Sequence, residues 1–150
     1  MKNAHIMLVE DNDGDIVLTQ EVFKNSGLCN PISVARDGEE ALDFLYMRNK
    51  FVNAERPDLI LMDINIPKMN GKEILAIIKQ DDNLKTIPVI MLTTSSAASD
   101  VLESYKNHAN CFVTKPLNFS DFAKAIGEIK SFWLTLVTTV NTKNKHHELR

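Results

Sequence analysis

The sequence predicts one α/β domain of the doubly wound type, in which helices cover both faces of a parallel sheet. The chain of 150 residues has the length of a single domain and an ordinary composition, 44% hydrophobic and 25% charged. Its short apolar runs show no alternation of polar and apolar residues, as expected of strands buried on both faces. Helical periodicity fills the gaps between these runs, which gives β-α units joined by right-handed crossovers.

The expected strands are four clear apolar runs and one weaker run that lies between Pro31 and the turn Asp37-Gly38. In chain order they are HIMLV (5–9), the weaker ISVA (32–35), LILM (59–62), VIML (89–92) and CFV (111–113).

The expected helices lie between these strands. Residues 13–24 form the first, and apolar faces at helical spacing predict the others: Ala41, Leu42, Leu45 and Tyr46; Ile74, Ile77 and Ile78; Ala98, Val101, Leu102 and Tyr105; and Phe122, Ile126, Ile129 and Trp133. Asn118 and Ser120 are candidate caps of the last helix. A polar connection at 47–58 and an extension at 134–150 lie outside this pattern.

Charge and cysteine content exclude several classes of function. The net charge is −3 and the basic residues are scattered, so a nucleic-acid-binding face is not expected. Two cysteines, Cys29 and Cys111, are too few for a disulfide framework or a zinc site. The apolar run near the start is too short for a signal peptide or a membrane span, so we expect a cytoplasmic protein without membrane contact.

Polar residues follow the carboxyl ends of the predicted strands, where open α/β sheets bind their ligands. They are Glu10, Asp11 and Asp13 after the first strand of the chain, Asp63 and Asn65 after the third, Thr93 and Thr94 after the fourth, and Lys115 after the fifth. Several carboxylates at one edge need a cation or raised pKa values, because two of them about 5 Å apart repel by roughly 3 kcal/mol.

This combination suits phosphoryl transfer. Oxygen ligands at a preformed edge are suited to Mg²⁺, and a carboxylate can form an aspartyl phosphate. Each residue alone has an ordinary explanation. Asp63 is equally typical of a turn or helix cap, Glu10 and Asp11 of caps, and Lys115 of a solvated surface residue. Their occurrence together, each at the end of the right strand, favours the chemical interpretation.

With these motifs, residues 4–132 resemble the receiver domain of two-component response regulators. The segments that carry the resemblance are IMLVEDND, LILMDINIPKMNG, VIMLTT and CFVTKPLN. It implies a flavodoxin-like fold with a five-stranded sheet in the order 2-1-3-4-5. It also implies that Asp63 accepts the phosphoryl group, with Thr93 and Lys115 binding that group. Mg²⁺ would be held by Glu10, Asp11, Asp63 and the backbone carbonyl of Asn65.

The resemblance further implies a switch and partners. Thr93 would couple phosphorylation to Phe112, where the family often carries Tyr, and the alternative for Phe112 is a plain core residue. A histidine kinase would be the phosphoryl donor, and a downstream protein or histidine phosphotransferase the target. The long loop before the third strand and the segment IKSFWLTLVTTV resemble regulators paired with phytochrome kinases.

Two questions stay open from the sequence, the activity of the chain and the place of segment 133–150. The chain is expected to be a stand-alone signalling protein rather than an enzyme, with an inactive scaffold receiver or a small aspartyl-phosphate phosphatase as alternatives. A dinucleotide-binding domain is excluded, because VEDNDGD has only Gly14 in the first turn. The segment 133–150 either packs on the domain or a dimer interface, or is a frayed extension.

Overall fold

The computed structural model of the protein describes residues 4–24, 32–93, 111–114 and 118–131. Five parallel strands form one sheet in the order β2-β1-β3-β4-β5. Their bounds are Ile6–Val9 for β1, Ser33–Ala35 for β2, Leu59–Met62 for β3, Val89–Thr93 for β4 and Cys111–Thr114 for β5. The predicted fold class and strand order are confirmed.

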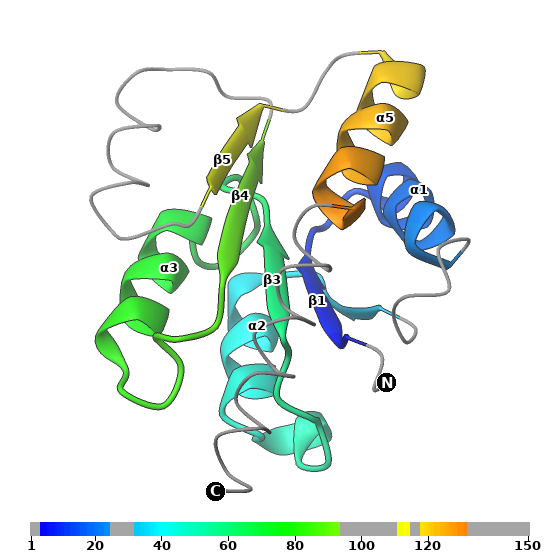
Figure 1. Ribbon diagram of the computed structural model, residues 1–150. Coiled ribbons are helices and arrows are strands. Elements are labelled where there is room, and N and C mark those ends of the chain that lie inside the picture. Colours follow the sequence, from blue (N-terminus) through cyan, green and yellow to red (C-terminus); the bar gives the residue numbers. More distant parts are fainter. Residues whose placement is uncertain (1–3, 25–31, 94–110, 115–117, 132–150) are drawn as a thin grey trace, which may run out of the picture.

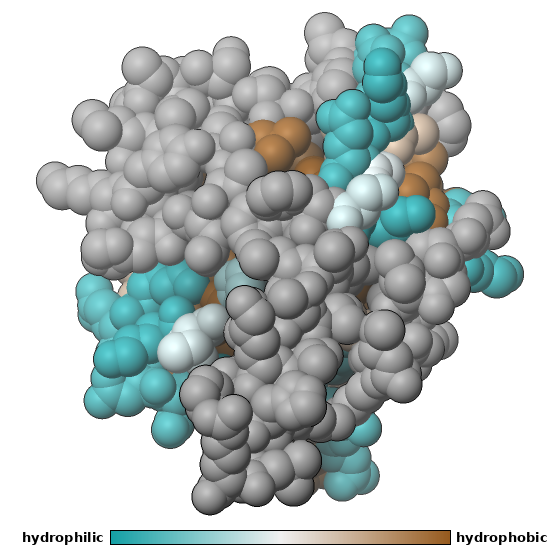
Figure 2. Space-filling model, in the orientation of Figure 1, coloured by the Kyte–Doolittle hydropathy of each residue, from teal (hydrophilic) through white to brown (hydrophobic). Residues whose placement is uncertain are grey.

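The described helices cover the two faces of this sheet in pairs (Figure 1). They are α1 (Asp13–Lys24) and α5 (Phe119–Ile129), which pack together on one face, and α2 (Gly38–Leu45) and α3 (Gly71–Gln80) on the other. Hydrophilic side chains cover the outer parts of α3 and α5 seen in Figure 2, as expected of amphipathic helices. The helix expected around residues 98–105 lies outside the described residues.

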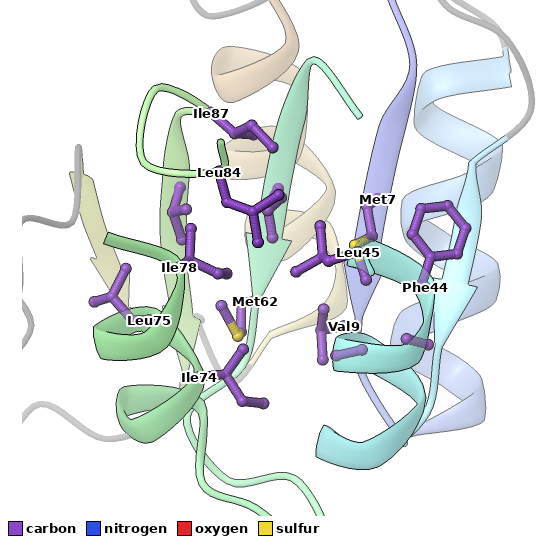
Figure 3. Close-up of a cluster of buried hydrophobic side chains, with 14 of the residues drawn as sticks. Met7, Val9, Phe44, Leu45, Met62, Ile74, Leu75, Ile78, Leu84 and Ile87 are labelled. Atoms are coloured by element: carbon purple, nitrogen blue, oxygen red, sulfur yellow. The ribbon is translucent and has the colours of Figure 1, made fainter. Parts of the chain in front are cut away.

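Two hydrophobic clusters lie against the two faces of the sheet, because successive strand residues point to opposite sides. In β1, Met7 and Val9 belong to the cluster under α2 and α3, which Figure 3 shows, while Ile6 and Leu8 belong to the cluster under α1 and α5. All four side chains are at most 2% exposed. Burial on both faces explains why the strand sequences do not alternate.

Helix capping removes one ordinary explanation for the acidic residues. Asn12 caps α1 by accepting a hydrogen bond from the Asp15 amide at 2.9 Å, so the capping role considered for Glu10 and Asp11 is wrong. Asn70, not Asp63, caps α3. Asn118 caps α5 as expected, and Ser120 lies inside the first turn of the helix.

The connection at 47–58 is more ordered than its polar sequence indicates. It contains a short 3-10 helix, η1 (Asn49–Phe51). The backbone has a positive φ at Met47, before this helix, and at Asn49, its first residue. The Arg56 guanidinium then donates to the Asn83 carbonyl and, at 2.9 Å, to the Thr86 hydroxyl. These bonds fix the connection to the segment before β4. Within the described ranges, no helix is both long and apolar enough to cross a membrane.

Candidate functional site

Glu10 and Asp63 are neighbours at the carboxyl edge of the sheet because β1 and β3 pair in parallel up to their last residues. Val9 pairs with Met62, and Glu10 and Asp63 are the residues that follow this last pair. The Asp63 amide donates to the Val9 carbonyl at 3.0 Å, and the Glu10 amide donates to the Ala35 carbonyl at 3.0 Å. Backbone pairing therefore fixes where both acidic residues leave the sheet.

Both acidic side chains are buried at this edge. Glu10 is 3% exposed and Asp63 9%, whereas Asp11 is exposed. Each carboxylate accepts a local backbone hydrogen bond, Glu10 from the Asn12 amide at 3.2 Å and Asp63 from the Asn65 amide at 3.1 Å. Asp63 thus forms the turn that an aspartate commonly forms after a strand. Adjacent strands lie only about 4.8 Å apart, so two buried carboxylates at the ends of neighbouring strands favour a cation here.

The segment that carries Asp63 and Asn65 is the β3–α3 loop, residues 63–70. It closes on itself through the Gly71 amide, which donates to the Ile64 carbonyl at 2.8 Å. A Cβ atom at Gly71 would lie 2.2 Å from the Asp63 carbonyl oxygen, so only glycine allows this approach. The glycine that ends the segment LILMDINIPKMNG is therefore required by the geometry of the loop next to Asp63.

A second contact joins this loop to the start of α2. The Gly38 amide donates to the Pro67 carbonyl at 3.1 Å. The Lys68 amine lies 3.2 Å from Glu39 and 3.5 Å from Asp37. The hydrogen bond to Glu39 and the charges of both acids raise the pKa of Lys68 above its usual value. Sequence reasoning missed this contact, because its two sides are about 30 positions apart.

Charged residues from three elements also meet beside α1. Arg36 forms an ion pair with Asp13 at 2.6 Å, and Lys50 forms one with Glu40 at 2.8 Å. The Lys50 hydrogen bond, helped by the Arg36 amide, holds the pKa of Glu40 below its ordinary value. These four residues border an open cavity of about 450 Å³ whose other lining residues include Ile16 and Val34. No sequence signal marked this cluster, since each residue alone is typical of a solvated surface.

The remaining predicted site residues come from β4 and β5. Thr93 ends β4 opposite Thr114, and Phe112 pairs with Met91 inside β5. The structure places their backbones and does not describe their side chains. Lys115 follows β5 directly in the sequence and lies outside the described residues. Among the residues that are described, no group of three Asp, Glu, His or Cys side chains is arranged to hold a metal ion by itself.

Comparison with known proteins identifies the family. The model of the response regulator receiver domain matches residues 6–127. The chain belongs to the response regulator receiver family. The match covers all five strands of this receiver, together with Glu10, Asp63 and the β3–α3 loop.

Relatives of this receiver include regulators of phytochrome signalling. Response regulator Rcp1 of Synechocystis sp. is 47% identical over 133 residues, 89% of this chain and 90% of Rcp1. The crystal structure of Mn(2+)-bound Rcp1 has a TM-score of 0.85 at 46% identity, over 87% of this chain and 94% of that chain. The crystal structure of the phosphorylated cyanobacterial phytochrome response regulator RcpA has a TM-score of 0.86 at 45% identity, over 89% of this chain and 96% of that chain. The receiver therefore resembles phytochrome-associated response regulators of nearly its own length.

Proposed function

We propose that this receiver is a phosphoacceptor of a two-component phosphorelay, and that Asp63 accepts the phosphoryl group. The observation that carries the proposal is the burial of the Asp63 carboxylate at the end of β3, directly beside the buried Glu10 at the end of β1. A rigid sheet presents the nucleophile, and phosphoryl transfer needs mainly positioning and charge neutralisation from the protein.

The donor set at this edge fits Mg²⁺. The side chains of Glu10, Asp11 and Asp63 and the carbonyl of Asn65 offer hard oxygen ligands, and Mg²⁺ commonly takes one or two carboxylates and keeps several waters, so three converging acids are not required. In our proposal the side chains of Glu10, Asp11 and Asp63 and the carbonyl of Asn65 hold the ion. When bound, it neutralises the oxygens of the transferring phosphoryl group. The Mn(2+)-bound form of Rcp1 supports this assignment.

The transfer itself uses the residues of this chain in separate roles. The Asp63 carboxylate attacks phosphorus, and the bond from phosphorus to the imidazole nitrogen of the donor histidine breaks. Thr93 donates a hydrogen bond to a phosphoryl oxygen and Lys115 pairs with its charge. The movement of Thr93 toward the phosphoryl group vacates space for the ring of Phe112, which changes the surface that a partner protein contacts.

The output of this receiver is protein binding rather than metabolism. We propose a cytoplasmic protein that takes phosphoryl groups from a histidine kinase of the phytochrome type and acts on a downstream protein or histidine phosphotransferase. The similarity to Rcp1 and RcpA, which extends over at least 90% of each of these relatives, supports the link to phytochrome signalling. The phosphorylated form of RcpA supports phosphorylation as the signal.

The test is phosphorylation with acetyl phosphate, followed on a phosphate-affinity gel with and without Mg²⁺. We expect a Mg²⁺-dependent shifted band in the wild type and none in Asp63→Asn. Asp82→Asn is the matched control, because Asp82 is an exposed aspartate that pairs only with Lys85 among the ion pairs of the described residues. A wild type that neither shifts nor binds Mg²⁺ would support the scaffold alternative.

The C-terminal segment 133–150 is a separate part of the proposal and lies outside the described residues. Its apolar, β-branched stretch from Trp133 to Val140 would be prone to aggregation if exposed. We propose that it packs, either on its own domain or across a homodimer interface. Gel filtration of the full chain beside a truncation after Phe132 tests the dimer, and identical elution as monomers would exclude it.

A further inference from the structure

The first turn of α2 packs directly against the backbone of the β3–α3 loop. A Cβ atom at Gly38 would lie 2.4 Å from the Met69 Cβ and 2.9 Å from the Met69 carbonyl oxygen. Real Cβ atoms do not come this close, so the contact requires glycine at position 38. The hydrogen bond from the Gly38 amide to the Pro67 carbonyl, 3.1 Å long, fixes the same contact in register.

The loop adopts an unfavourable backbone conformation at this contact. Lys68 has a φ of 69°, in the left-handed region that L residues other than Asn and Asp seldom adopt. Such a conformation persists only where the surroundings hold it. Here Pro67 and Met69, on either side of Lys68, contact Gly38, and the Lys68 amine pairs with Glu39 and Asp37. The first turn of α2 therefore determines how the loop passes over it.

This contact lies two residues beyond Asn65 in the same loop. Ile66 alone separates Asn65 from Pro67, and its amide donates to the Ile64 carbonyl at 3.2 Å, so a displacement of residues 67–69 passes through Ile66 to Asn65. We propose that Gly38 is a positioning residue: by holding residues 67–69, α2 sets the place of the Asn65 carbonyl in the metal site. This inference rests on the proposed function.

The surroundings decide how a substitution at Gly38 will act. An open pocket of about 270 Å³ is lined by Leu42, Lys68 and Met69 among others. Lys68 and Met69 therefore border space into which they can move. A methyl group at position 38 should therefore displace the loop rather than unfold the domain.

The first experiment compares Gly38→Ala with Gly127→Ala. Gly127 in α5 is the matched control, because a Cβ atom there meets nothing within 4 Å. Mg²⁺ binding is measured by titration calorimetry, and amide hydrogen exchange by NMR in the metal-free protein. We expect Gly38→Ala to bind Mg²⁺ about tenfold more weakly or worse, the range typical of lost support behind a metal ligand. The Gly71 amide, bonded to Ile64, should also exchange faster. A folded Gly38→Ala with wild-type affinity and exchange would overturn the inference.

A second variant, Lys68→Asp, gives an answer if Gly38→Ala does not fold. It changes an exposed residue and places a third acid against Asp37 and Glu39, which pushes the loop away from α2. Added negative charge alone would strengthen Mg²⁺ binding, so weaker binding supports loop displacement and equal or stronger binding contradicts it. If the wild type binds no Mg²⁺, the proposed function and this inference are both overturned. If the wild type binds Mg²⁺ and the variants bind it with the same affinity, the inference alone is overturned.

Discussion

Gly71→Ala gives the sharpest test of the geometry around Asp63. The added methyl group would lie 2.2 Å from the Asp63 carbonyl oxygen, 3.0 Å from the Ile64 Cα and 3.1 Å from the Asp63 carbonyl carbon. All three are backbone atoms, so no side-chain rotation relieves the overlap. Either the start of α3 or the end of β3 must move, and the hydrogen bond from the Gly71 amide to the Ile64 carbonyl lengthens.

The magnitude follows from the cost of overpacking. Forcing a methyl group into a filled site costs about 1–3 kcal/mol, and a backbone neighbour places this case at the upper end. For a domain of this size, each kcal/mol lowers the melting temperature by about 2–4 °C. We therefore expect Gly71→Ala to melt about 6–12 °C below the wild type. Gly127→Ala should instead gain about 0.5–1 kcal/mol, since alanine favours a helix over glycine.

The assay is urea and thermal unfolding followed by circular dichroism for the wild type and the two alanine variants. Equal urea slopes for all three proteins would show that the same surface is exposed on unfolding and that the midpoints can be compared. A Gly71→Ala variant that melts within about 2 °C of the wild type would refute the close approach described here.

Three further changes test other parts of the fold. Leu61→Ala removes a fully buried side chain from the central strand β3 and should cost about 2–5 kcal/mol in urea unfolding, whereas a loss below 1 kcal/mol would contradict the packing. Asn70→Ala removes the cap that accepts from the Lys72 amide at 2.7 Å and should cost about 0.5–2 kcal/mol. Tyr46→Phe removes a 2.8 Å hydrogen bond to Asp81 that lowers the pKa of that carboxyl below its ordinary value, so the wild type should be slightly more stable than the variant near pH 6. Because the hydrogen bond favours the ionised carboxyl, this difference should be lost in melting experiments as the pH falls through the lowered pKa of Asp81, and its persistence in stronger acid would exclude this origin.

The strands of this receiver could be predicted from sequence because their burial leaves a local trace. Ile6 to Val9 and Leu59 to Met62 have no polar residue, and each proved buried on both faces. The helix from Asp13 to Lys24 was also predicted with its bounds. Where the burial of an element follows from its own residues, the local sequence pattern is enough to predict that element.

What the sequence did not reveal depends on contacts between distant positions. Asn12, Glu10 and Asp11 are all polar residues before a helix, and only the hydrogen bond from the Asp15 amide to the Asn12 side chain shows which of them is the cap. Gly38 looks like an ordinary turn residue beside Asp37, yet glycine is required there because a Cβ atom would overlap Met69, which is distant in the sequence. The roles of Asp63 and its neighbours in phosphoryl transfer stay predictions until they are measured.

The two faces of the sheet differ in when they can be covered during synthesis. Among the described residues, the cluster under α2 and α3 draws on residues 7–91, so these parts of it are present once β4 has been made. The cluster under α1 and α5 needs Phe122, Ile126 and Ile129, which come near the end of the chain. Until α5 emerges from the ribosome, Ile6 and Leu8 of β1 and Leu59 and Leu61 of β3 lack the side chains of α5 that complete their cluster. A nascent or truncated receiver is thus most exposed to chaperones and proteases on this one face.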